Sequence, residues 1–166
     1  NLDLIAYVQA LLNEHGIKSN LVFNDDKTKA NLYATIGPEV PGGIVLSGHT
    51  DVVPVEDQDW QSDPFTLVER NGCYYGRGTC DMKGFLAVIL AFAPKMKLSS
   101  LTRPIHIAMS YDEEVGCQGV GRMIEKIVTD LPPVSGVIVG EPTMMTPVTA
   151  HKSIHAFETI VTGSAA

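Results

Sequence analysis

The stretch GIVLSGHTD, residues 43–51, decides the fold of this chain, because a mostly apolar run ends directly in a histidine and an acid. Apolar runs of this kind are typical of the central strands of a sheet that helices cover on both faces. His49 and Asp51 lie two residues apart, so on an extended segment their side chains point the same way. The stretch therefore predicts a central strand with functional groups at its carboxyl end, where ligands bind in open α/β sheets.

Acidic side chains recur at further points, each directly after a strand-like apolar run or a glycine-rich loop. Together with His49 they make a donor set of one imidazole and several carboxylates, which suits zinc, manganese or cobalt. The acidic positions are Asp81, Glu113, Glu114 and Glu141. Their shared place after strands and loops predicts that they meet at one edge of the sheet, in a metal site.

Each of these signals has a simpler interpretation when it is taken alone. A His-x-Asp triplet is usually a surface or capping pair, and Asp81 before an apolar helix would make a good N-cap. The acidic run 112–114 can be a solvated turn, and Glu141 can cap a strand. If one of Glu113 and Glu114 binds a metal, however, the other is free to act as the base for a metal-activated water.

Composition limits the class of protein. The 166 residues, 45% of them apolar, fit one domain with a substantial core. A net charge of -7 argues against a nucleic-acid partner, and no apolar stretch is long enough to span a membrane. The three cysteines form no Cys-x-x-Cys pair, which argues against a zinc ribbon or a disulfide framework. We therefore expect a cytoplasmic protein without a membrane or nucleic-acid partner.

Apolar periodicity and turn residues predict an α/β fold with a mixed, mostly parallel central sheet and helices on both faces. Asn71-Gly72 indicates a tight hairpin, and Pro94 is expected to end a buried helix that starts at Asp81. The expected helices are 3–15, 81–93 and 119–129. The expected strands are 20–24, 30–36, 43–48, 65–69, 73–75, 105–110 and 135–140.

The pattern changes after Pro142, where only strand-like runs follow, at 147–151 and 155–162. We therefore divide the chain into a partial catalytic domain, residues 1–146, and the first strands of a second module, residues 147–166. Both ends look cut, since Asn1 leads at once into a helical pattern and the last strand-like run has nothing to close it. The chain is accordingly expected to be a fragment of a longer protein.

Four motifs, in order and spacing, resemble the dizinc family of acetylornithine deacetylase, succinyl-diaminopimelate desuccinylase, aminoacylase and related carboxypeptidases. The motifs are SGHTDVVP at 47–54, GRGTCDMKG at 76–84, DEEVG at 112–116 and GEPT at 140–143. The resemblance implies a zinc-peptidase-like catalytic domain that binds two Zn²⁺ ions, with Co²⁺ as an alternative. It also implies a cis peptide between Asp81 and Met82, and a lid domain that starts near residue 147 and forms a homodimer.

The resemblance assigns a role to each candidate residue. His49 and Glu141 would bind one metal, Asp81 would bridge both, Glu114 would bind the second, Glu113 would be the general base and Asp51 would orient His49. The family's last metal-binding histidine and its lid histidine have no matching positions, because His15, His106, His151 and His155 fall outside the motifs. The second metal therefore lacks an expected ligand in this chain.

Within that family, the segments around Trp60, Phe65, Arg77 and Tyr111 are most similar to acetylornithine deacetylases. The implied reaction removes acetate from N2-acetyl-L-ornithine to give ornithine, a step of arginine biosynthesis. Another N-acyl amino acid, hydrolysed by a desuccinylase-like or aminoacylase-like enzyme, stays open as the substrate, and so does a non-catalytic metal-binding relative. Trp60 and Phe65 are interpreted as loop packing residues.

Competing chemistries are disfavoured by the sequence. The order Lys83-Gly84 after Gly78 does not match a phosphate-binding loop, and no Gly-x-Ser-x-Gly elbow of a serine hydrolase occurs. Cys80 and Cys117 lie beside proposed site residues, so a thiolate ligand or nucleophile is conceivable. Neither has a histidine at a motif-like spacing, and both are interpreted as small packing residues.

Overall fold

The computed structural model describes residues 1–150, 152 and 157–163. Its helices are α1 (Leu2–Glu14), α2 (Lys83–Leu98) and α3 (Val120–Asp130). Its strands are β1 (Ser19–Phe23), β2 (Ala30–Ile36), β3 (Gly43–His49), β4 (Val68–Arg70), β5 (Cys73–Tyr75), β6 (Ile105–Ser110) and β7 (Val134–Val139). Nearly all of these elements lie within a few residues of the predicted ones.

Five strands form one mixed sheet in the order β1-β2-β6-β3-β7. β3 runs parallel to both β6 and β7, whereas β2 is antiparallel to β1 and to β6. A mixed, mostly parallel sheet was predicted; in this five-stranded sheet, two strand pairs are parallel and two are antiparallel. Because β3, β6 and β7 are parallel, their carboxyl ends meet at one edge of the sheet, and His49 ends β3 there.

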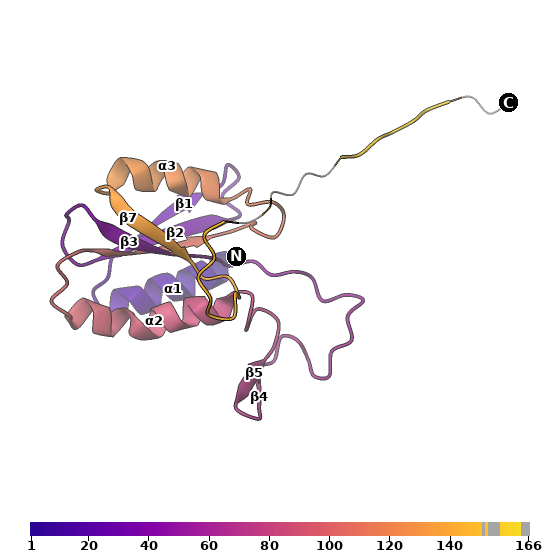
Figure 1. Cartoon of the computed structure of the whole chain (residues 1–166), viewed down its shortest axis with the longest axis horizontal. Coiled ribbons are helices and arrows are strands. Elements are labelled where there is room, and N and C mark those ends of the chain that lie inside the picture. The colour runs from indigo at the N-terminus through magenta and orange to yellow at the C-terminus, as the bar shows by residue number, and fades with distance from the viewer. Residues whose placement is uncertain (151, 153–156, 164–166) are drawn as a thin grey trace.

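Helices cover both faces of this sheet, as predicted. Figure 1 shows α3 on one side, and α1 with α2 on the other. One face of β2 and β6 packs against the apolar side of α1, which buries Ile5, Val8 and Leu12, and against α2. The opposite face packs Tyr33 and Ala108 against α3. The central strands β3 and β6 are thus held from both sides, which gives the site at their ends a fixed base.

Two details of α2 differ from the prediction. The helix continues through Pro94 to Leu98, although proline removes one helical hydrogen bond. Met96, beyond the proline, packs against the core, and this burial favours another turn of helix. The helix is also amphipathic rather than buried all round, because Val88 is 57% and Phe92 is 50% exposed.

The segment between β3 and α2 projects from the sheet-bearing body and carries the β4–β5 hairpin (Figure 1). Asn71 and Gly72 both have positive φ, at 54° and 74°, as the predicted two-residue turn requires. Arg77 stacks over the Trp60 ring at 5.1 Å, so Trp60 does pack within this segment. Phe65 is 70% exposed, and its interpretation as a packing residue is wrong.

The strands expected after Pro142 are not formed in the part of the chain that the structure describes. Residues 147–150 and 157–163 carry no strand assignment and are exposed. A strand needs a hydrogen-bonding neighbour, and β7 is the last strand of the sheet on that side. His151 and His155 lie outside the described residues. Among the described helices, none has the length and apolar character that crossing a membrane would require.

Candidate metal centre

His49 sits at the carboxyl end of β3 and is only 1% exposed. Its backbone N–H lies 3.2 Å from the Met82 sulfur, which ties the end of β3 to the start of α2. The neighbouring Gly48 makes this approach possible, because a Cβ there would lie 2.7 Å from the tips of the Met82 and Leu86 side chains. The apolar contact between β3 and α2 therefore fixes the imidazole.

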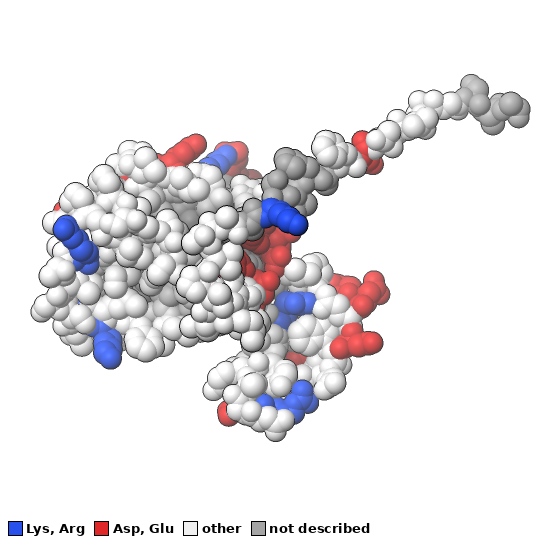
Figure 2. All heavy atoms as spheres, viewed as in Figure 1, with Lys and Arg blue, Asp and Glu red and all other residues white. Residues whose placement is uncertain are grey.

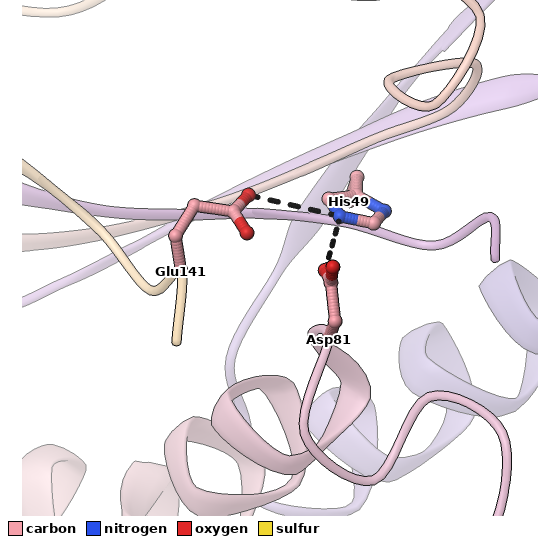
Figure 3. Close-up of side chains that lie close together, drawn as sticks. All are labelled: His49, Asp81 and Glu141. Atoms are coloured by element: carbon pink, nitrogen blue, oxygen red, sulfur yellow. Dashed lines mark hydrogen bonds and ion pairs between the residues drawn. The ribbon is translucent and has the colours of Figure 1, made fainter. Parts of the chain in front are cut away.

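Asp81 lies two residues before α2 and faces His49 (Figure 3). Met82, and not Asp81, is the N-cap residue of α2, and no side chain caps the helix. The simple capping interpretation of Asp81 is therefore wrong. The peptide between Asp81 and Met82 is cis, as the resemblance implied. Because it caps no helix, the Asp81 carboxylate is free to face the imidazole.

Three carboxylates approach the same nitrogen of His49. Nε2 lies 3.3 Å from Asp81 Oδ1, 3.7 Å from Glu141 Oε1 and 3.8 Å from Glu113 Oε2. Glu141 reaches this point from the residues just after β7, and its carboxylate points toward His49 in Figure 3. The structure thus brings together groups that are up to 92 residues apart in the sequence.

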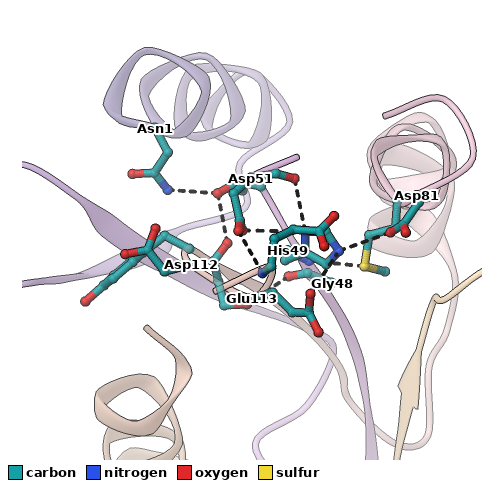
Figure 4. Close-up of polar contacts among 12 residues, drawn as sticks. Asn1, Gly48, His49, Asp51, Asp81, Asp112 and Glu113 are labelled. Carbon is teal, nitrogen blue, oxygen red and sulfur yellow. Dashed lines mark hydrogen bonds and ion pairs between the residues drawn. The ribbon is translucent and has the colours of Figure 1, made fainter. Parts of the chain in front are cut away.

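The other ring nitrogen of His49 is held by Asp51. Nδ1 lies 3.0 Å from the backbone oxygen of Asp51 and 3.5 Å from its carboxylate Oδ1 (Figure 4). An Nδ1–H that donates to this carbonyl leaves the lone pair of Nε2 facing the three carboxylates. The Nε2 lone pair and the carboxylate oxygens are all acceptors, so they repel one another, and a cation bound between them would remove this repulsion. This is the orientation of a metal-binding histidine with a carboxylate behind it.

The acids form two groups around His49. Donor atoms of His49, Asp81 and Glu141 lie within 4.8 Å of one another, and so do those of His49, Glu113 and Glu114. The first group is the predicted ligand set of one metal. The second group contains both the predicted ligand Glu114 and the predicted base Glu113. Donor atoms of these two neighbouring acids therefore lie equally within reach of His49.

Electrostatics also favour a bound cation. Burial raises the pKa of Glu114 above its ordinary value, and the charge of Asp81 adds to the rise. Burial likewise raises the pKa of Glu141, again with a contribution from Asp81. Figure 2 shows acidic side chains gathered in a notch between the sheet-bearing body and the projecting segment. Ionised carboxylates this close repel one another, and the donor set fits a divalent metal.

Several residues that hold the site in place were not predicted from the sequence. Asn1 donates to Thr50 Oγ1 at 2.9 Å, and Thr50 in turn donates to the Ser110 carbonyl at 2.8 Å (Figure 4). Lys29, directly before β2, and Asn31, in β2, contact the segment that carries Glu113 and Glu114. A usable signal was Asn31 itself, a polar residue within the otherwise largely apolar run 30–36.

The remaining candidates take no part in the described site as ligands. Cys80 and Cys117 are free and exposed, so their interpretation as packing residues is wrong. The Cys117 thiol lies 3.6 Å from Glu113 Oε1, and partial desolvation together with the charge of Glu113 raises its pKa, which disfavours the thiolate. His106 is buried in β6, where Nδ1 lies 2.9 Å from Thr35 Oγ1. The predicted placement of His106 within a strand is confirmed.

Comparison with known proteins shows which family this chain resembles. The family model for peptidase family M20/M25/M40 matches residues 45–158. The chain is 39% identical to an acetylornithine deacetylase of Pasteurella multocida and 45% identical to one of Photorhabdus laumondii. Both matches run over 153 residues, which are 92% of this chain. The chain spans about 39% of the length of these curated relatives.

Solved structures share the fold. Human carnosine dipeptidase 1 has a TM-score of 0.71 at 22% identity, over 82% of this chain and 32% of that protein. An M20 family metallo-carboxypeptidase of Sulfolobus solfataricus has a TM-score of 0.70 at 25% identity, over 81% of this chain and 31% of that protein. The predicted zinc-peptidase-like architecture is therefore confirmed.

Proposed function

The chain belongs to peptidase family M20/M25/M40, and on this premise we propose that it carries the metal-binding groups and the base of a metal-dependent amide hydrolase. The observation that supports this most directly is the convergence of three carboxylates on His49 Nε2. Identity of 39% and 45% to acetylornithine deacetylases favours N2-acetyl-L-ornithine as the substrate, with ornithine and acetate as products.

The proposed ligands follow the two groups of donors. His49, Asp81 and Glu141 would hold one metal, and Glu114 would hold a second that shares Asp81. Two Zn²⁺ ions are proposed, with Co²⁺ as an alternative, since imidazole and carboxylate suit both. A metal bound there supplies an activated water and polarises the amide carbonyl.

Two side chains of the protein, Glu113 and Asp51, would transfer the proton and orient the histidine ligand. Glu113 would accept the proton of the attacking water and deliver it to the departing amine, as a positioned carboxylate can do. Asp51 would keep Nδ1–H of His49 engaged, so that Nε2 keeps its lone pair toward the acids. The side chains of Asp81, Glu113 and Glu141 are 48, 38 and 36% exposed, which would leave the site accessible to substrate.

The test combines metal analysis with hydrolysis assays. After dialysis against Zn²⁺ or Co²⁺, the full-length protein should retain bound metal and release acetate from N2-acetyl-L-ornithine. N-succinyl-diaminopimelate and other N-acetyl amino acids should be cleaved more slowly, whereas preference for one of them would assign the alternative acyl-amino-acid substrate. Absence of bound metal would refute the metal-dependent mechanism. Bound metal without hydrolysis of any of these amides would favour a non-catalytic relative.

We propose three further features of the protein. We place the boundary of the second module near residue 147, expect that module to form a homodimer, and expect the protein in the cytoplasm. The family resemblance supports the first two, and cysteine usage supports the third. Light scattering would give the mass in solution, and a mass equal to one subunit would refute the dimer.

A further inference from the structure

The segment 111–119, here called the Glu113 loop, connects β6 to α3 and carries two of the proposed site residues. Its own backbone bonds make it compact: the N–H groups of Gly116 and Cys117 both donate to the Glu113 carbonyl at 2.9 Å. The Gln118 N–H donates to the Asp112 carbonyl at 3.0 Å. The direction of the Glu113 side chain therefore depends on how the whole loop is anchored.

The loop's backbone needs such an anchor. Asp112 and Cys117 both have φ of 57°, in the left-handed region that residues other than glycine disfavour. Conformations of this kind persist when the surrounding structure fixes them. Asp112 directly precedes Glu113, so whatever fixes Asp112 also fixes the start of the acidic pair.

Asn31 of β2 closes the two ends of the loop. Its side chain is fully buried, donates from Nδ2 to the Gly119 carbonyl at 2.9 Å, and accepts from the Tyr111 N–H at 3.2 Å. The ends are in close contact, since a Cβ on Gly119 would lie 2.1 Å from the Tyr111 carbonyl oxygen. One amide thus replaces the main-chain partners that both loop ends would otherwise lack.

Lys29 holds the residue before the acidic pair. Its Nζ lies 2.6 and 2.7 Å from the two carboxylate oxygens of Asp112. The contact joins residues 83 positions apart in the sequence, from the turn before β2 to the loop after β6. On the inner side, Asp51 Oδ2 accepts from the Glu114 N–H at 3.0 Å, and Asp51 also lies behind His49 (Figure 4). Lys29 on one side and Asp51 on the other therefore hold the segment that carries Glu113 and Glu114.

We propose that Lys29 and Asn31 are positioning residues, which hold the Glu113 loop so that Glu113 and Glu114 face His49. Neither residue touches the proposed ligand atoms, and neither belongs to the four motifs. The inference rests on the proposed function for its catalytic consequence, but the holding of the loop is a property of the protein without metal. The two parts can therefore be tested separately.

The first experiment measures amide hydrogen exchange on metal-free protein. Lys29→Met should make the Glu114 amide exchange at least about tenfold faster, while β6 amides are unchanged. Lys29→Arg keeps the charge and should restore slow exchange. Arg122→Met is the matched control, because it removes a cation of another 2.6 Å ion pair, with Asp25, from the neighbourhood of the loop. It should leave the Glu114 amide unaffected.

The second experiment measures Zn²⁺ affinity by chelator competition, together with kcat and KM, on the full-length protein. Lys29→Met should weaken Zn²⁺ binding about tenfold and lower kcat about tenfold, with KM within about twofold, as supporting residues outside the ligand set do. Lys29→Arg should recover both values. Equal effects of Lys29→Met and Arg122→Met would overturn the proposal in favour of a general charge effect.

Asn31 is tested without a variant, because a buried substitution there risks unfolding. The Tyr111 amide of the unmodified protein should be as protected as the amides of β6, and free exchange at Tyr111 would overturn the Asn31 contact. Unchanged exchange of Glu114 in Lys29→Met would overturn the role of Lys29. Failure of the unmodified protein to bind Zn²⁺ or cleave amides would refute the proposed function instead, and the exchange results would still stand.

Discussion

At the scale of single residues, two glutamates of the site, Glu113 and Glu114, have different surroundings. Glu113 and Glu114 are neighbours in the sequence, yet Glu114 has its backbone N–H bound to Asp51, whereas Glu113 Oε2 lies 3.8 Å from His49 Nε2. Both fall within one group of potential ligands around His49. Either acid is thus placed to bind a metal or to act as the base.

Glu113→Gln is the substitution that decides between these roles. It keeps the shape of the side chain but removes its ability to accept a proton. If Glu113 is the base, kcat should fall by about 10² to 10⁴ while the metal content stays the same. Kinetics and elemental analysis on the same sample check this. Glu125→Gln on α3 is the control and should change neither value, and loss of metal in Glu113→Gln would make Glu113 a ligand instead.

The candidate residues themselves could be predicted from the sequence because each follows a strand or a tight loop. Their partners could not, because a partner depends on which strands become neighbours. Lys29 meets Asp112 only because β2 pairs with β6, and Asn31 meets Gly119 only because α3 starts over that face of β2. Apolar periodicity predicts the helices and strands but not the order of the strands in the sheet. Contacts between neighbouring strands, such as those of Lys29 and Asn31, therefore could not be predicted.

At the scale of elements, the start of α2 depends on close approach of backbones. Gly84 packs against the loop that precedes the helix, and a Cβ on Gly84 would lie 2.2 Å from the Thr79 carbonyl oxygen. The glycine density of residues 76–84 therefore serves contact within the protein. The end of α2 shows the opposite case, since Pro94 suggested a stop but burial of Met96 carried the helix further.

Two helical glycines make a matched pair for stability measurements. Gly84→Ala should destabilise the fold by about 1 to 3 kcal/mol, because backbone atoms must move to admit the methyl group. It should also weaken Zn²⁺ binding, since Asp81 lies three residues away. Gly121→Ala in α3, where a Cβ meets nothing within 4 Å, should instead stabilise by about 0.5 to 1 kcal/mol. Urea unfolding checks both values, and equal effects would contradict the packing argument.

The sheet also contains a pH-sensitive residue away from the site. His106 is buried between β2 and β3 in the sheet, and burial lowers its pKa, while its Nε2 has no hydrogen-bond partner. As the pH falls below about 6.5, the imidazole of His106 binds a proton in the unfolded chain but stays neutral in the folded protein. Stability should therefore decrease from pH 7 toward pH 5, by at most about 1.4 kcal/mol per pH unit from this residue.

His106→Leu isolates this contribution. The variant has no titrating group at this position, so its unfolding free energy should decline less between pH 7 and pH 5 than that of the unmodified protein. Urea unfolding at several pH values gives both slopes. His15→Leu, at the exposed end of α1, is the matched control and should keep the original slope. Parallel slopes for all three proteins would contradict the role of His106.

At the scale of the whole molecule, charge and fold are coupled through the site. The chain has a net charge of -7, and part of that excess is concentrated on acids that surround one histidine. They come from the segment before α2, the Glu113 loop and the residues after β7, so folding itself forces their repulsion. A cation bound there would stabilise the folded protein and not the unfolded chain, in which these groups are far apart.

Metal binding should therefore raise the melting temperature. At a free Zn²⁺ concentration of 100 times the Kd, the gain in unfolding free energy is about 2.7 kcal/mol. For a chain of this size that corresponds to about 5 to 10 °C. Thermal unfolding with Zn²⁺, with EDTA and with Mg²⁺ measures the shift, and Mg²⁺ should have less effect because imidazole is a poor ligand for it. His49→Ala should abolish the Zn²⁺ shift, whereas His15→Ala should preserve it. A shift that persists in His49→Ala would place the bound metal elsewhere in the molecule.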